Sequence, residues 1–106
     1  MDRFEVQEQI EQAFSEGLEK DELKKRMFNI YVEYAKFQKI TLNTERADII
    51  IEGLIRKKET NGKFYCPCRI VAGNDEEDDP KVCPCIWSMD EINDQGHCHC
   101  NLFTKG

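Results

Sequence analysis

The amino-acid sequence predicts a small, mainly α-helical protein in which residues 1–106 form one domain and the C-terminal part consists of loops and short helices. Residues 1–60 contain no cysteine and no proline, and their apolar residues recur at three- and four-residue steps, the spacing of amphipathic helices. All six cysteines and all three prolines lie between Cys66 and Cys100. Since a chain of 106 residues buries only a modest core, we expect a metal centre in this region to add stability.

Three helices are predicted within the first 60 residues. The second begins after a break near residues 19–20, with Asp21 as its N-cap. The third begins at Asn43 or Thr44 and stops at Asn61-Gly62. We expect the large apolar side chains of these helices to form the core rather than to contact a cofactor. The three apolar stripes are Val6, Ile10, Ala13, Phe14, Gly17 and Leu18, then Leu23, Met27, Ile30, Tyr31, Tyr34 and Ala35, then Ala47, Ile50, Ile51, Leu54 and Ile55.

The composition argues against several functional classes. A net charge of −6 disfavours nucleic-acid binding, which needs a clustered basic face. No apolar run approaches the roughly 20 residues that span a bilayer. The first five residues lack the basic and apolar stretches of a secretory signal. We therefore expect a protein of the reducing cytoplasm that binds neither nucleic acid nor membrane.

Two charged segments are also apparent. Residues 73–80 are acidic and rich in turn-forming residues, which predicts an exposed loop. Their spacing does not match an EF-hand, so we do not expect a calcium site there. A basic set near the first cysteines is either a docking patch for an acidic partner or a solvated helix end, and the sequence leaves both open. It comprises Arg56, Lys57, Lys58, Lys63 and Arg69.

The cysteines form three Cys-x-Cys units. Structural disulfides are disfavoured because the compartment is reducing and because cysteines one residue apart are poorly placed to bond to each other. Structural zinc sites usually have two to four residues between paired cysteines, and their four thiolates would leave two cysteines over. A zinc-binding structural or interaction module remains the main alternative. The three units are Cys66-Pro67-Cys68, Cys83-Pro84-Cys85 and Cys98-His99-Cys100.

A 4Fe–4S cluster suits this pattern better than zinc. Each thiolate binds a different iron, so neighbouring ligands can be spread further apart than around one ion. Four cysteines saturate the cluster, and the remaining two can form a redox-active disulfide. A disulfide takes two electrons whereas a ferredoxin delivers them singly, and an adjacent cluster can hold the odd electron. The spacing does not tell which four cysteines are ligands, and a cluster carrier without disulfide chemistry is a third interpretation.

The chain resembles the catalytic (beta) subunit of ferredoxin:thioredoxin reductase in four segments. These are Ile51-Glu52-Gly53-Leu54, Cys66-Pro67-Cys68-Arg69, Cys83-Pro84-Cys85 and Cys98-His99-Cys100-Asn101-Leu102-Phe103. The ordered set of three cysteine motifs is highly specific. The resemblance extends from about Met27 to Phe103, and residues 1–25, with an extra N-terminal helix, lie outside it. A related archaeal or bacterial ferredoxin-dependent disulfide reductase is equally compatible with these motifs.

The resemblance implies roles that the spacing does not give. Residues 62–103 would form the cluster-binding and active-disulfide region, and His99 would take the position of the family's catalytic histidine. Ferredoxin would donate electrons to the chain, and thioredoxin or a similar protein disulfide would accept them. The implied ligands of one 4Fe–4S cluster are Cys66, Cys83, Cys85 and Cys98, and the implied active disulfide joins Cys68 and Cys100.

The chain departs from the chloroplast-type pattern in its loop lengths. The segment Arg69–Val82 is slightly shorter and Ile86–His97 is longer, but surface loops can absorb both differences. The chloroplast-type enzyme pairs with a small variable subunit, and the sequence does not show whether this chain has one. We expect His97 to be a loop residue and Trp87 to pack against its neighbours. Arg69 either tunes the cluster or faces a partner.

Overall fold

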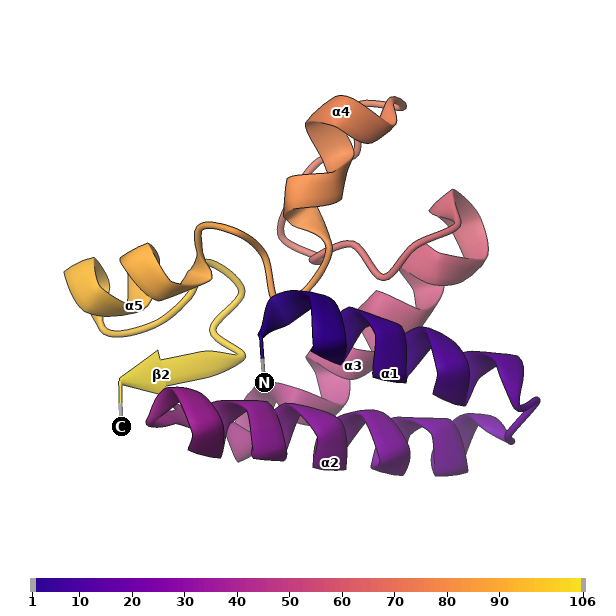
Figure 1. Cartoon of the computed structure of the whole chain (residues 1–106), viewed down its shortest axis with the longest axis horizontal. Helices are drawn as coiled ribbons and strands as arrows, with labels where there is room; N and C mark the ends of the chain where they lie inside the picture. Colours follow the sequence, from indigo (N-terminus) through magenta and orange to yellow (C-terminus); the bar gives the residue numbers. More distant parts are fainter. Residues whose placement is uncertain (1, 106) are drawn as a thin grey trace.

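The structure is a computed structural model that describes residues 2–105, and it is mainly helical, as predicted (Figure 1). Two short strands accompany the helices. Within the described residues, no helix combines the length and the apolar character that a membrane span requires. In chain order the elements are α1 (Arg3–Ser15), α2 (Lys20–Gln38), β1 (Ile40–Leu42), α3 (Thr44–Asn61), α4 (Asp75–Asp78), the 3₁₀ helix η1 (Asp79–Lys81), α5 (Ser88–Gln95) and β2 (Phe103–Lys105).

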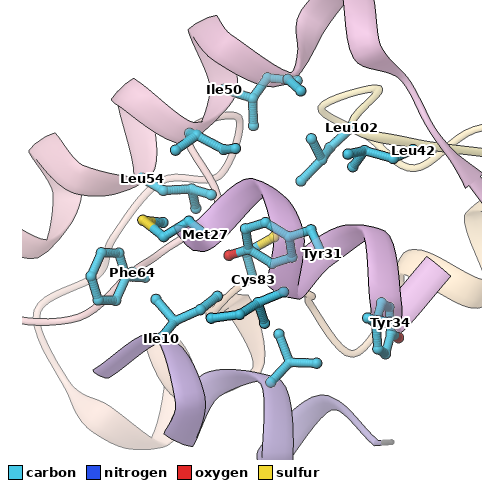
Figure 2. Packing of buried hydrophobic residues seen from close by; sticks show 14 of the residues in the cluster. Ile10, Met27, Tyr31, Tyr34, Leu42, Ile50, Leu54, Phe64, Cys83 and Leu102 are labelled. Carbon is cyan, nitrogen blue, oxygen red and sulfur yellow. The ribbon is translucent and has the colours of Figure 1, made fainter. Parts of the chain in front are cut away.

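The core lies between α1, α2 and α3. Helix α2 packs against both α1 and α3, and the apolar stripes predicted for α2 and α3 are buried at every position. Figure 2 shows Met27 and Tyr31 of α2 between Ile10 on one side and Leu54 on the other. Burial of a large apolar side chain contributes about 1.5–3 kcal/mol, so this three-helix packing supplies much of the stability of the fold.

The predicted helix boundaries need two corrections. Helix α1 ends at Ser15, so Gly17 and Leu18 lie outside the helix that their spacing predicts. The reason is that the chain turns back at Gly17 with a φ of +71°, which suits a glycine. The N-cap of α2 is Glu19 and not Asp21, which lies in the first turn. The boundaries of α3 are confirmed, with Asn43 as its N-cap and Gly62, in a left-handed conformation, as its C-cap.

The two strands are an addition that the sequence analysis did not predict. Strands β1 and β2 pair antiparallel, with Thr41 opposite Thr104 and Leu42 opposite Phe103. Next to the pair, the Asn43 N–H donates to the Leu102 carbonyl at 2.7 Å. Phe103 is buried edge-on against Tyr31 and Tyr34 of α2. This pairing fixes the segment just after the third cysteine motif against the helical core.

The prediction of an exposed acidic loop at residues 73–80 is wrong in part. Asn74 caps the short helix α4, which continues into η1, and both stand apart from the three-helix core (Figure 1). Asp78 is buried, because its carboxylate accepts hydrogen bonds from the backbone N–H groups of residues 72–74 and from the Lys81 ammonium. The carboxylate therefore organises the segment instead of facing solvent.

Candidate functional site

The three cysteine motifs lie in the loops of the C-terminal half. All six cysteines are free thiols, and five of them are buried while Cys68 is exposed. Backbone hydrogen bonds join the first two motifs, because the Cys66 N–H donates to the Lys81 carbonyl at 2.9 Å and the Cys83 N–H donates to the Phe64 carbonyl at 3.0 Å. The third motif is tied to β2, because the Cys98 N–H donates to the Phe103 carbonyl at 3.0 Å.

The sulfur atoms of the first and third motifs meet in the interior. The Sγ atoms of Cys98 and Cys100 are 3.8 Å apart, and the Cys100 thiol also lies within hydrogen-bonding reach of Cys66. These contacts lower the pKa of Cys98 to about 6 and lower the pKa of Cys66. The pKa of Cys100 is raised, because its thiol hydrogen-bonds with the sulfurs of Cys66 and Cys98 and because it is buried. The site therefore favours negative charge on Cys66 and Cys98 over Cys100.

Backbone N–H groups add to the stabilisation of Cys98. The Phe103 N–H donates to Cys98 Sγ at 3.3 Å, and the N–H groups of Leu102 and Asn101 also lower the pKa of this thiol. Asn101 adopts a left-handed conformation with a φ of 64°, as the chain turns back toward Cys98. Hydrogen bonds to a thiolate sulfur are the environment expected of a metal ligand or a reactive cysteine.

Burial is the main influence on the two thiols of the second motif. Burial raises the pKa of both Cys83 and Cys85, and the Arg69 guanidinium opposes the shift at Cys85. The Cys83–Pro84 peptide bond is cis. Cys68 differs from the other cysteines because it is the exposed one. Its pKa is raised by the burial of part of the side chain and by the neighbouring Cys66.

Two buried donors beside the second motif test whether this site suits an anionic sulfur-rich group. Among residues 2–105, the Tyr31 hydroxyl and Arg69 Nε have no well-formed hydrogen bond. The Tyr31 hydroxyl lies against Cys83 (Figure 2), and the Arg69 guanidinium contacts Cys85. Spare buried donors next to cysteine sulfurs fit an iron–sulfur cluster, whose sulfur atoms accept hydrogen bonds. The helical periodicity marks Tyr31 only as a core residue and does not indicate its contact with Cys83.

A polar group connects all three motifs. Arg69 directly follows the first motif, and its Nη2 atom donates to both Glu91 oxygens at 2.8 Å and to Cys85 Sγ at 3.5 Å. Glu91, on α5, also accepts from the backbone N–H of His99 at 3.1 Å. Arg69 thus points toward the second motif and α5. Trp87 lies over its guanidinium, with 4.7 Å between Cζ and the ring centroid, and is itself 39% exposed.

The two histidines lie on either side of Cys98. His99 is exposed, next to the buried Cys98 and Cys100 in the chain. His97 is half-buried, with its Nδ1 atom 2.8 Å from the Cys98 carbonyl, and it pairs with Thr104 in an isolated bridge. His97 thus lies beyond the helices, as expected, although it is held at the edge of the small sheet.

Two structural supports of the site were missed by sequence reasoning. Gly53 of α3 lies so close to Pro67 that a Cβ atom would approach the ring at 2.8 Å. Arg3 of α1 donates through Nε to the Pro84 carbonyl at 2.9 Å and through Nη2 to the Val82 carbonyl at 3.3 Å. Gly53 lies in one of the four segments that carry the family resemblance, so the sequence did contain a signal for it. Nothing in the sequence marks Arg3.

The predicted basic patch is mostly neutralised within the chain. Four of its five cations form ion pairs: Arg56 with Glu52, Lys58 with Glu11, Lys63 with Asp75 and Asp79, and Arg69 with Glu91. Exposed paired charges are worth little individually, but they reduce the net positive field. The ion pairs therefore compensate much of the positive charge of this set.

Comparison with known proteins gives the family. The family described as "Ferredoxin thioredoxin reductase catalytic beta chain" matches residues 15–106, beginning earlier than the resemblance carried by the motifs. A relative from Synechocystis sp., "Ferredoxin-thioredoxin reductase, catalytic chain", is 39% identical over 59 residues. That alignment covers 52% of this chain and 45% of the relative, so the chain matches less than half of the relative's length. The chain belongs to the ferredoxin thioredoxin reductase catalytic beta chain family.

Proposed function

We propose that this chain is an iron–sulfur oxidoreductase that uses electrons from ferredoxin to reduce a protein disulfide, with thioredoxin as the expected acceptor. The observation that carries the proposal is the separation of one exposed thiol, Cys68, from five buried ones in a member of this family. A protein disulfide can be reached only by an exposed nucleophile, whereas cluster ligands and a resolving thiol are better kept from solvent.

Four buried cysteines are the proposed ligands of one 4Fe–4S cluster. Three of them have donors at hand: backbone N–H groups at Cys98, Arg69 at Cys85 and the Tyr31 hydroxyl at Cys83. When bound, the cluster would take up electrons one at a time, so that a one-electron donor can serve a two-electron disulfide. The proposed ligands are Cys66, Cys83, Cys85 and Cys98.

The proposed disulfide chemistry uses Cys68 and Cys100. The Cys68 thiolate attacks one sulfur of the acceptor disulfide, that S–S bond breaks, and the second acceptor sulfur leaves as a thiolate. Cys100 then attacks the Cys68 sulfur of the mixed disulfide, which forms the Cys68–Cys100 disulfide and releases the first acceptor sulfur. The acceptor gains two electrons and two protons. Two electrons from ferredoxin and two protons from solvent then restore the Cys68 and Cys100 thiols.

His99 is the proposed proton carrier. It is adjacent to Cys100 in the chain and exposed to solvent, so it can supply a proton to Cys100 or stabilise the Cys100 thiolate. We further propose a cytoplasmic location, where thiols stay reduced, and a small variable subunit remains a possible partner. Neither feature is needed for the chemistry at the cysteines.

The first experiment is anaerobic purification followed by iron, sulfide and zinc analysis and an absorption spectrum. We expect about four irons and four sulfides per chain and a brown protein. One zinc per chain, with no iron and no colour, would contradict the redox assignment and favour a structural zinc module. Loss of Cys68 and Cys100 without loss of electron transfer would favour a cluster carrier.

Cysteine variants test the roles separately. Cys68→Ser should keep the iron but form no mixed disulfide with a monothiol thioredoxin, and Cys100→Ser should keep the iron and accumulate that mixed disulfide. Cys83→Ser should lose iron, because it removes a proposed ligand. A stable mixed disulfide in Cys68→Ser would show that another sulfur attacks the acceptor.

A further inference from the structure

We propose that Arg69 and Glu91 form a positioning pair that holds the three cysteine motifs in register and raises the reduction potential of the proposed cluster. The inference rests on the proposed function, because it concerns the same site. It assigns a role to two residues outside the Cys-x-Cys units. Both act through other groups, since neither is a proposed ligand or nucleophile.

The first step is the contact between the pair and the second motif. Arg69 Nη2 donates to Glu91 Oε1 and Oε2 at 2.8 Å and to Cys85 Sγ at 3.5 Å. The side chains of Arg69 and Glu91 are only 18% and 20% exposed, so solvent screens their charges less than those of a surface pair. The guanidinium therefore places a fixed positive charge beside a proposed cluster ligand.

The second step is the contact between the pair and the third motif. Glu91 Oε1 accepts the His99 N–H at 3.1 Å, between Cys98 and Cys100 in the chain. Helix α5 holds Glu91 in place, because the neighbouring Ile92 is 1% exposed and anchors the helix in the core. One carboxylate thus fixes both the guanidinium and the backbone that carries a proposed ligand and the proposed resolving thiol.

The third step is an unused donor. Arg69 Nε is buried and, among residues 2–105, has no hydrogen-bond partner. The Trp87 ring lies over the guanidinium, with 4.7 Å between Cζ and the ring centroid. A buried donor without an acceptor is destabilising. Because the same guanidinium contacts Cys85 through Nη2, this site is suited to an acceptor bound next to Cys85. Cluster sulfurs accept such hydrogen bonds, and these bonds influence the reduction potential.

The expected sign follows from the charge. Reduction of the cluster adds one electron and no atoms, so the reduced form carries one more negative charge. A guanidinium and its N–H groups stabilise that form more than the oxidised form, which raises the potential. Removal of Arg69 should therefore shift the potential to a more negative value.

Glu91 gives a test of positioning against simple charge. If Glu91 acted only through its own negative charge, Glu91→Ala would raise the potential. If it acts by holding Arg69, Glu91→Ala frees the guanidinium and lowers the potential. The double variant Arg69→Gln/Glu91→Ala should then shift no further than Arg69→Gln alone, because the two residues work as one unit.

The experiment is a dye-mediated reductive titration of the anaerobic protein, followed by absorption, with iron and sulfide measured for each variant. We expect negative shifts for Arg69→Gln and Glu91→Ala and a smaller shift for Arg69→Lys, which keeps the charge but loses the guanidinium contacts. Iron loss to a chelator should be roughly 10–100-fold faster in Arg69→Gln. The control is Arg26→Gln, which breaks the exposed Arg26–Glu16 pair and should shift nothing.

Other outcomes overturn the inference in distinguishable ways. An unchanged potential in Arg69→Gln, or a raised one in Glu91→Ala, contradicts it while the proposed function stands. If Arg69→Gln does not incorporate the cluster, the reduction potential of Arg69→Lys is compared with that of the wild type instead. A wild-type protein without iron contradicts both the proposed function and the effect on potential. The positioning role is then decided by amide hydrogen exchange at His99, expected to be about tenfold faster in Glu91→Ala.

Discussion

Single side chains set how closely the cysteine motifs approach the helices that support them. Gly53 lets the ring of Pro67 lie directly on α3. A Cβ atom added at Gly53 would be only 2.8 Å from that ring. Glycine within a helix normally costs about 1 kcal/mol relative to alanine, so this residue lowers the helix propensity of α3. Its presence is explained by the close approach of the first motif.

We predict that Gly53→Ala destabilises the protein although it improves helix propensity. Overpacking against Pro67 costs about 1–3 kcal/mol, which exceeds the gain of about 1 kcal/mol in propensity. The expected net loss of about 1 kcal/mol should lower the melting temperature by about 4–8 °C. Glu59→Ala, at an exposed position of the same helix, is the control and should change little. A stabilised Gly53→Ala protein would show that the Pro67 loop yields without cost.

Asp78 determines how the segment between the first two motifs responds to acid. Three backbone N–H groups and the Lys81 ammonium surround its carboxylate. These contacts, with the Ala72 N–H first, lower the pKa of Asp78 from 3.8 to about 2. Because the pKa is lower in the folded state, the ionised carboxylate stabilises the fold fully above about pH 4 and loses this effect as the pH falls toward 2.

The stability difference between wild type and Asp78→Asn should therefore be largest near neutral pH and should shrink between about pH 4 and 2. Urea unfolding of both proteins across this range measures it, on reduced preparations treated identically so that acid affects any bound metal in the same way. Asp94→Asn, at an exposed position of α5, serves as the control. A difference that does not vary with pH would mean that shape, not charge, gives Asp78 its role.

Helix α1 supports the site through its first turn. Arg3 donates to the carbonyls of Val82 and Pro84, on either side of Cys83, and more weakly to those of Asp79 and Pro80. Gln7 adds a long contact of 3.5 Å to the Val82 carbonyl. Arg3 precedes the residues 15–106 that match the family, so this support comes from outside the matched segment.

Arg3→Ala should loosen the second motif while leaving the helical core folded. Hydrogen bonds to a charged group contribute about 1.5–3 kcal/mol, and we expect the lower end because most of these contacts are long. Hydrogen exchange of the amides in residues 79–86 should quicken by about tenfold, a change that about 1.4 kcal/mol produces. Glu8→Ala, at an exposed position of the same helix, should leave these amides unchanged. Equal exchange rates in Arg3→Ala and Glu8→Ala would show that Arg3 does not support the second motif.

Long elements and short elements differ in how far the sequence predicts them. The apolar stripes of α2 and α3 each recur over several turns, so their buried residues could be identified in full. The strands β1 and β2 have three residues each, which is too few for an alternation to appear. Helix α4 forms in an acidic run because a cap at Asn74 and the buried Asp78 outweigh the composition.

The candidate site was predictable where it is carried by the three Cys-x-Cys units. Their ordered set gave the family resemblance, which implies that the three units share one site, and the sulfur of Cys66 does meet those of the third unit. The contacts of Arg3 with the second motif and of Glu91 with Arg69 join residues far apart in the sequence, with no periodicity to reveal them. Their partners are fixed by the tertiary fold, so only the structure identifies these supports.

The molecule as a whole combines a half of three long helices with a half of short elements and loops. Helix α2 packs against both α1 and α3, and the buried residues of these helices share one core with Phe64, Cys83 and Phe103 of the second half. The remaining part has a four-residue α4, an eight-residue α5 and a single three-residue strand that pairs with β1. Helices this short and two-stranded sheets are marginal without further support. The proposed cluster would provide that support by linking four cysteines in three loops.

Removal of iron should therefore act unevenly along the chain. A chelator under anaerobic conditions should leave α1–α3 helical by circular dichroism, because α2 packs directly against both α1 and α3. Residues 62–105 should lose protection from hydrogen exchange, because the free energy of metal binding contributes directly to folding of such a region. Cys68→Ser should respond like wild type, and Cys98→Ser should resemble the chelated protein before chelator is added. Uniform loss of protection across both halves would instead mean that the two parts fold as one unit, and unchanged protection in residues 62–105 would mean that their packing suffices without a cluster.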